Sequence, residues 1–236
     1  MASIRELAAC LELPGNFSIL QDFFGYITPV PQPISLLRQA QLLQGPYINL
    51  NLIQVGVYDG DPQRVMRMNV GLQFTRQVYD NVDLGIGRVD YYELAASEKV
   101  NGFTIITSGT EAIDLTNEWF APGYAIDAFF VIFIADALGY TTVDGPCNKS
   151  QHYQGFYYVA TGVVVATDMP GNLGITLAHE IGHYLGLEHQ GDVNNLMYEG
   201  AVATQLAPWQ AEKIKGHCFV LPGCGSQLEV EGGGFL

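Results

Sequence analysis

Basic residues are scarce in this chain of 236 residues. Lysine and arginine together number 10, against 24 aspartates and glutamates, which gives a formal net charge of -14. A chain this acidic disfavours nucleic acids and anionic membrane surfaces as partners, because both carry negative charge. The same charge favours cations, so calcium is an expected accessory ion.

Long apolar segments and targeting signals are also missing. The longest apolar run, residues 128–135, is far shorter than the roughly 18 residues that indicate a membrane-spanning helix, and it is typical of a buried strand. The start, MASIRELAAC, lacks the charged head and apolar stretch of a signal peptide. Either the protein is not exported by that route or a presequence has been removed. We nevertheless expect a secreted or extracellular protein.

Cysteine is infrequent, and its spacing argues against one class of metal site. Cys10, Cys147, Cys218 and Cys224 contain no C-x-x-C pair, which disfavours a cysteine-rich zinc knuckle. Disulfides and buried free thiols both stay open as alternatives. Cys218 and Cys224 flank the short segment FVLPG, a loop that a disulfide could close.

The remaining composition is that of a folded protein. Hydrophobic residues make up 48% of the chain and charged residues only 14%, which excludes a disordered chain. We expect one domain with appendages, or two subdomains around a cleft. Residues 1–44, with two short helices and the proline-rich connector TPVPQP, are expected to form an N-terminal appendage. The main domain should cover residues 45–225, and the glycine-rich residues 226–236 should form a flexible tail.

Hydrophobic periodicity predicts strands and helices in the main domain. Residues 47–52 alternate between apolar and polar side chains, as in a strand with one wet face. Pro62 suits the first turn of a helix, and the apolar spacing extends that helix to Tyr79. Further strands are expected at residues 88–94, 103–108, 128–135 and 157–167. These elements predict a mixed α/β layer.

The segment HEIGHYLGLEH, residues 179–189, contains three of the five histidines. His179 and His183 are four residues apart, so a helix places both imidazoles on one face, within reach of one metal ion. Gly186 can adopt the left-handed conformation that ends a helix, so the chain can reverse and bring His189 as a third ligand. Three ligands leave one coordination position for a water that faces Glu180, as in catalytic zinc sites.

A shorter match would carry less weight. Histidine pairs at this spacing are usually surface or core residues, and the five-residue pattern H-E-x-x-H occurs by chance. The eleven-residue form is much more constrained, because the glycine and the third histidine both fall where the mechanism requires them.

The complete pattern H-E-x-x-H-x-x-G-x-x-H resembles the metzincin clan of zinc endopeptidases. The resemblance covers roughly residues 47–220 and implies an α+β, zincin-like fold. In that fold, a mixed twisted sheet and the active-site helix form an upper subdomain, and a small lower subdomain follows the third histidine. The resemblance also implies a methionine turn beneath the metal, for which Met197 is the candidate and an ordinary core methionine the alternative. A helix at residues 206–216 would close the lower subdomain.

The family within the clan stays open, because Gln190 follows the third histidine and matches no assigned family. The motif is similar to the pappalysin and matrixin versions. Tyr198 directly follows Met197 and does not lie two positions beyond it, which disfavours a tyrosine ligand of the astacin or serralysin kind. Only His152 and His217 remain outside the motif, so a single catalytic zinc is expected.

The resemblance implies a zinc-dependent endopeptidase that acts on protein or peptide substrates. Zinc would lower the pKa of a water, and Glu180 would accept its proton and pass it to the leaving amine. The strand at residues 157–167 is expected to pair with an extended substrate along an exposed edge. Glu188 is expected to be a solvated residue without a catalytic role.

Two other functions stay open. One is a zinc-bearing binding or toxin-like module without significant peptidase activity, although the intact Glu180 argues against it. The other is a metal-dependent hydrolase of a non-peptide bond.

Latency is a further expectation from the resemblance, because metzincin zymogens commonly use a cysteine or aspartate of a pro-segment in place of the water. Cys10 and Asp22 are the candidates for this latency ligand within residues 1–44. For Cys10 the alternative is a core cysteine, and the stretch CLELPGN lacks the matrixin switch pattern.

Overall fold

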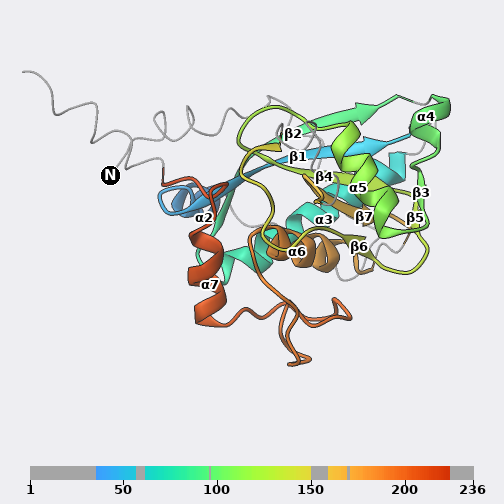
Figure 1. Cartoon of the computed structure of the whole chain (residues 1–236). Helices are drawn as coiled ribbons and strands as arrows, with labels where there is room; N and C mark the ends of the chain where they lie inside the picture. Colours follow the sequence, from blue (N-terminus) through green and yellow to red (C-terminus); the bar gives the residue numbers. More distant parts are fainter. Residues whose placement is uncertain (1–35, 57–61, 96, 150–158, 169–170, 224–236) are drawn as a thin grey trace, which may run out of the picture.

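A mainly parallel sheet forms the centre of the protein. The computed structural model describes residues 36–56, 62–95, 97–149, 159–168 and 171–223. Five strands lie in the order β2-β1-β4-β7-β6 (Figure 1). Neighbouring strands pair in parallel except β6, which runs antiparallel to β7 at one edge. The strands are β1 (Tyr47–Val55), β2 (Gly85–Leu94), β4 (Ile126–Val131), β6 (Gly139–Tyr140) and β7 (Val163–Ala166).

Helices cover both faces of this sheet. Leu50 and Leu52 of β1 belong to one apolar core together with residues of α3 and α6, whereas Ile53 and Val55 belong to a second core with residues of α5. This division follows from the two-residue period of a strand, which sends successive side chains to opposite faces. The helices are α2 (Leu36–Leu42), α3 (Pro62–Asp80), α4 (Glu98–Asn101), α5 (Gly109–Glu118), α6 (Leu173–Tyr184) and α7 (Pro208–Lys215).

The predicted mixed α/β layer is confirmed, with differences at particular segments. The helix predicted from Pro62 to Tyr79 and the strand predicted at residues 88–94 form as α3 and as the larger part of β2. The apolar run at residues 128–135 divides between β4 and β5 (Phe133–Ile134), and β5 pairs with β3 (Ile105–Ile106) in a separate two-stranded sheet. The strand of the main sheet ends before Ile132. The amide of Ile132 donates to the carbonyl of Thr104, next to β3, and so does not pair within the main sheet.

Helix α5 was not predicted, although the sequence contains a signal for it. The side chain of Ser108 accepts a hydrogen bond from the amide of Glu111 and so caps the first turn. Serine followed three residues later by glutamate is the capping pattern that precedes many helices.

The prediction for residues 157–167 was wrong about the edge of the sheet. The described strand in this segment, β7, pairs with β4 on one side and with β6 on the other, so it is an interior strand. The free edge belongs instead to β6, which the sequence pattern did not reveal because it contains only Gly139 and Tyr140.

The pairing of Cys218 with Cys224, one of the alternatives open from the sequence, was also wrong. Cys218 forms a disulfide with Cys147, 71 residues earlier in the chain. The two cysteines meet because the residues after α7 return to the segment that follows β6. The bridge therefore encloses β7, α6 and α7 in one covalent loop. Cys10 and Cys224 lie outside the described residues.

The N-terminal segment ends against the main domain. Arg38 of α2 forms ion pairs with Asp80 and Asp83, at 2.6 and 3.0 Å, beside the end of α3. Leu43, just after α2, is buried. Residues 1–35 and the tail at 226–236 lie outside the described residues, so the predicted first helix and the predicted flexible tail stay predictions.

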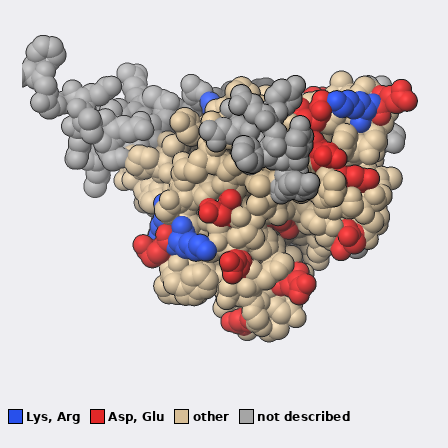
Figure 2. All heavy atoms as spheres, viewed as in Figure 1, with Lys and Arg blue, Asp and Glu red and all other residues tan. Residues whose placement is uncertain are grey.

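The surface agrees with the acidic composition. Figure 2 shows acidic side chains spread across the visible face, with basic side chains confined to a few places on it. Among the described helices, none combines the length and the apolar character needed to cross a membrane.

Candidate active site

Helix α6 carries the first part of the histidine motif. Its side chains at His179, Glu180 and His183 are all buried beneath the sheet. The helix ends at Tyr184, and Gly186 then adopts a φ of +96°, a conformation that side chains other than glycine rarely adopt. This left-handed turn reverses the chain and brings His189 back to the helix, as its spacing in the sequence predicts.

The three imidazoles converge on one point. One ring nitrogen from each of His179, His183 and His189 lies within 4.8 Å of the others. The Nε2 atoms of His179 and His189 are 3.3 Å apart. Tetrahedral zinc with bonds of about 2.0–2.1 Å to nitrogen requires nitrogen atoms about 3.3–3.4 Å apart. The donor set therefore fits a zinc ion.

Backbone carbonyls determine which ring nitrogens can bind a metal. Nδ1 of His179 donates to the carbonyl of Leu196 at 2.7 Å, and Nδ1 of His183 donates to the carbonyl of Leu187 at 2.6 Å. A carbonyl can only accept, so each Nδ1 carries the proton and each Nε2 presents a lone pair. Burial lowers the pKa of both rings, that of His183 to about 4, which keeps them neutral.

Glu180 lies beside the converging rings. Its side chain is only 7% exposed, and burial raises its pKa to about 8. A bound cation would oppose this shift, because a nearby positive charge favours the carboxylate. Glu180 and the three histidines line a cavity of about 290 Å³. The cavity also borders two segments, which are residues 136–141, containing β6, and Glu199 with Ala201.

Comparison with protein families assigns the chain to a family of metallopeptidases. The model of the family described as Metallo-peptidase family M12B Reprolysin-like matches residues 63–190, more than half of the chain, including the whole motif. The chain belongs to this family. The prediction of a metzincin-clan zinc metallopeptidase is thereby confirmed.

Comparisons with individual proteins find only distant similarity. No curated protein sequence matches this M12B reprolysin-like chain. Among solved structures, archaemetzincin from Methanopyrus kandleri is 14% identical with a TM-score of 0.48, over 72% of this chain and 94% of its own. Metalloproteinase-II from Bacteroides fragilis is 16% identical with a TM-score of 0.46, over 73% and 53%. Mature mirolysin from Tannerella forsythia, in complex with a cleaved peptide, is 14% identical with a TM-score of 0.40, over 72% and 90%.

Met197 of this M12B reprolysin-like protein lies directly beneath the motif helix. Its side chain is fully buried, and its sulfur would be 2.7 Å from a Cβ atom placed on Gly182. Gly182 lies between His179 and His183 in the sequence. The backbone of Met197 also accepts a hydrogen bond from the amide of Gln190, next to His189. The residue therefore supports the histidines by packing, and its assignment as the methionine of a Met-turn stays a prediction.

We expect Met197→Leu to leave zinc binding largely intact and to lower the free energy of unfolding by less than about 1.5 kcal/mol, because the two side chains have similar volumes. Zinc content and urea unfolding of the purified variant measure both effects. Met68→Leu, which changes a buried methionine of α3, is the matched control. Complete loss of zinc in the Met197 variant alone would contradict a packing role.

The edge strand β6 lies over the motif helix. Tyr140 lines the cavity, and its hydroxyl donates to Asp136 at 2.6 Å. Gly139 packs against the side chain of Glu180, because a Cβ atom placed on it would lie 2.6 Å from Cγ of Glu180. Sequence reasoning missed both residues, because a strand of two residues has no periodicity to detect.

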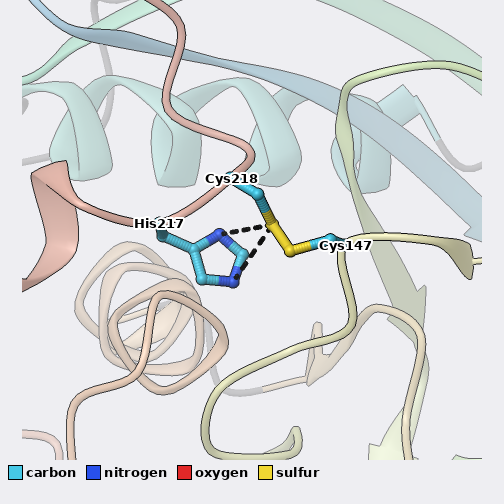
Figure 3. A group of neighbouring side chains, drawn as sticks. All are labelled: Cys147, His217 and Cys218. Carbon is cyan, nitrogen blue, oxygen red and sulfur yellow. Dashed lines mark hydrogen bonds between the residues drawn. A yellow bond between two sulfur atoms is a disulfide. The ribbon is translucent and has the colours of Figure 1, made fainter.

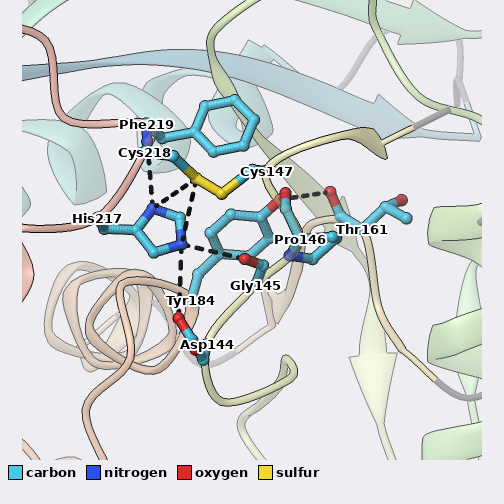
Figure 4. Close-up of a disulfide and its surroundings, with 9 residues drawn as sticks. All are labelled: Asp144, Gly145, Pro146, Cys147, Thr161, Tyr184, His217, Cys218 and Phe219. Atoms are coloured by element: carbon cyan, nitrogen blue, oxygen red, sulfur yellow. Dashed lines mark hydrogen bonds and ion pairs between the residues drawn. A yellow bond between two sulfur atoms is a disulfide. The ribbon is translucent and has the colours of Figure 1, made fainter. Parts of the chain in front are cut away.

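The segment that follows β6 holds the C-terminal end of α6 in place. The amide of Asp144 donates to the carbonyl of His183, and the amide of Gly145 donates to the carbonyl of Tyr184. The hydroxyl of Tyr184 lies within hydrogen-bonding distance of the carbonyl oxygens of Pro146 and Thr161 (Figure 4). The end of the motif helix is therefore held in place by residues 144–146 next to Cys147.

A second group of possible metal ligands contains Cys147, His217 and Cys218 (Figure 3). The two thiols form the disulfide, and the ring of His217 lies beside it. Nε2 of His217 donates to the carbonyl of Gly145, and Nδ1 accepts from the amide of Phe219. Because both ring nitrogens have hydrogen-bond partners, His217 is a structural residue beside the disulfide.

The remaining predicted site residues have different positions. Glu188 is exposed and does not line the cavity. Cys10, Asp22 and His152 lie outside the described residues, so their predicted relation to the zinc site stays a prediction.

Proposed function

We propose that this protein is a zinc endopeptidase in which His179, His183 and His189 hold the metal and Glu180 is the general base. The observation that carries this proposal is the convergence of three histidines beside a buried carboxyl group. In His179 and His183, the hydrogen bond from Nδ1 to a backbone carbonyl leaves the lone pair of Nε2 available to a metal ion. A site built only to bind zinc needs no such carboxyl group.

The chemistry divides between the metal and the protein. A zinc ion held by the three histidines would polarise the scissile carbonyl and would lower the pKa of a bound water toward neutrality. Glu180 accepts the proton of the attacking water and then gives it to the nitrogen of the leaving amine, so that the amide bond breaks without net gain or loss of protons at Glu180. The position of Glu180 supports this role, because its carboxyl group lines the same cavity as the three imidazoles and so can reach a water held between them.

The edge strand β6 supports a peptide as substrate. Within the described residues, no other strand pairs with the outer edge of β6. An extended peptide can add to such an edge through backbone hydrogen bonds, which recognise any sequence. Because β6 borders the cavity that contains Glu180, a peptide on this edge would pass over the catalytic group.

Hydrolysis of a peptide blocked at both ends tests the endopeptidase proposal. The substrate is a quenched fluorescent peptide with an acetylated amino terminus and an amidated carboxyl terminus, and casein is the protein substrate. We expect cleavage that a chelator abolishes and added zinc restores. Zinc binding without cleavage of either substrate would favour the alternative of a binding or toxin-like module.

Latency, calcium binding and location are further proposals. We expect a Cys10→Ser, Asp22→Asn variant of the full chain to be more active than the unchanged protein if either side chain blocks the zinc. Equal activity would contradict the zymogen proposal.

Calcium binding is supported only by the acidic composition, and calorimetric titration with calcium tests it. The disulfide supports a secreted protein, because such bonds persist mainly in oxidising compartments. Fractionation of the producing cells tests that location.

A further inference from the structure

We propose that Gly139 is a positioning residue, whose missing side chain sets the place of Glu180 beneath the substrate-binding edge. The inference rests on the proposed peptidase function and adds to it a residue outside the motif. It follows from three observations, which concern the space above Glu180, the direction of the backbone at Gly139 and the independent support of the histidines.

The space above Glu180 has no room for a side chain at position 139 unless Glu180 moves. A Cβ atom on Gly139 would lie 2.6 Å from Cγ of Glu180, 2.8 Å from its Oε1 and 2.9 Å from its Cδ. Real Cβ atoms essentially never approach other atoms to within 3.0 Å. Gly139 is not among the described glycines with positive φ, so the requirement for glycine here is one of space. Glycine in a strand often marks such a close approach.

The backbone of the same residue faces the open edge. The amide of Ala166 donates to the carbonyl of Leu138, so the backbone groups of Leu138 point toward β7. Gly139 pairs with Val165 in the same antiparallel register. Because backbone groups alternate in direction along a strand, the N–H and C=O of Gly139 point away from β7. They are the groups that a substrate strand would contact.

Gly139 therefore fixes the distance between two parts of the site. Its backbone presents the edge on which a peptide would lie, and the same backbone packs closely against the side chain of Glu180. A methyl group at this position would push the carboxyl group away, because the flexible end of Glu180 can move more easily than the sheet. The histidines should stay in place, since the carbonyls of Leu187 and Leu196 hold two of them independently of β6.

The first test is the kinetics of Gly139→Ala. We expect full zinc content, a KM within about twofold of the unchanged protein, and a kcat lower by roughly 10- to 100-fold, as for a catalytic group displaced by about 1 Å. Gly171→Ala is the matched control, because nothing lies within 4 Å of a Cβ atom there and its φ is not positive. A kcat within twofold of the unchanged protein, or loss of zinc together with activity, would overturn the proposal.

The second test measures the packing of Gly139 on Glu180 without any activity. Gly139→Ala should lower the midpoint of thermal unfolding by about 2–4 °C, the shift expected for roughly 1 kcal/mol in a domain of this size. In a Glu180→Ala background the same change should have no such effect, because the side chain that meets the new methyl group is gone. Equal destabilisation in both backgrounds would show that the methyl group clashes elsewhere and would refute the positioning role. If the unchanged protein cleaves no peptide, the peptidase proposal fails, whereas this cycle still decides whether the two residues meet.

Discussion

Glu180→Ala should retain about one zinc per chain and lose peptide hydrolysis. The substitution leaves the three imidazoles and their backbone hydrogen bonds unchanged, so the metal has all its ligands. It removes the group that accepts the proton of the attacking water, and loss of a general base lowers kcat by roughly 10²- to 10⁴-fold. Zinc content by mass spectrometry and hydrolysis of the quenched peptide measure the two effects separately.

His189→Ala should fail in a different way. Its ring provides the third nitrogen of the cluster, and the motif helix contributes only the other two. Removing it should lower zinc affinity and hydrolysis together, and excess zinc should partly restore activity. Zinc should not restore activity to Glu180→Ala.

Glu188→Gln is the matched control for both variants. Glu188 lies between the helix and the third histidine, is exposed and does not line the cavity. Its removal changes the charge of the same segment without touching the proposed machinery, so activity and zinc content should stay within twofold. A Glu180→Ala variant as active as this control would exclude Glu180 as the general base.

Removal of the disulfide should produce the largest loss of stability. The Cys147→Ser, Cys218→Ser double variant opens a loop whose ends lie 71 residues apart. A cross-link across a loop of this length lowers the conformational entropy of the unfolded chain by an amount equivalent to about 4 kcal/mol. We expect the free energy of unfolding, measured in urea by circular dichroism, to fall by about that amount. At 25 °C the folded fraction should still bind zinc, because the bridge supplies none of the metal ligands.

A reductant provides the control for this prediction. Dithiothreitol should lower the urea midpoint of the unchanged protein toward that of the double variant and should leave the double variant unchanged. This result would show that the oxidised protein and the double variant differ in stability only because of the bridge. Equal midpoints for the oxidised protein and the double variant would show that the bridge contributes no stability.

The zinc site could be predicted from the sequence because its geometry is local. Three of its chemical groups lie on one helix, where a spacing of four residues places His179 and His183 on the same face. The third histidine follows from a helix end that only glycine adopts easily, and Gly186 has the expected left-handed conformation. Helix α3 was predictable for the same reason, since its start and its periodicity both depend on neighbours along the chain.

The tertiary structure alone decided the features that join distant segments. The edge position of β6, the pairing of Cys147 with Cys218 and the close approach of Gly139 to Glu180 each depend on residues many positions apart. A strand pattern shows which side chains face the core, but it does not show which strand is outermost, because backbone hydrogen bonds are nearly independent of side-chain identity. Likewise, the sequence does not show which residue a given cysteine or glycine will contact in the folded chain. Packing determines these partners, and so the motif was evident from the sequence while the edge above it was not.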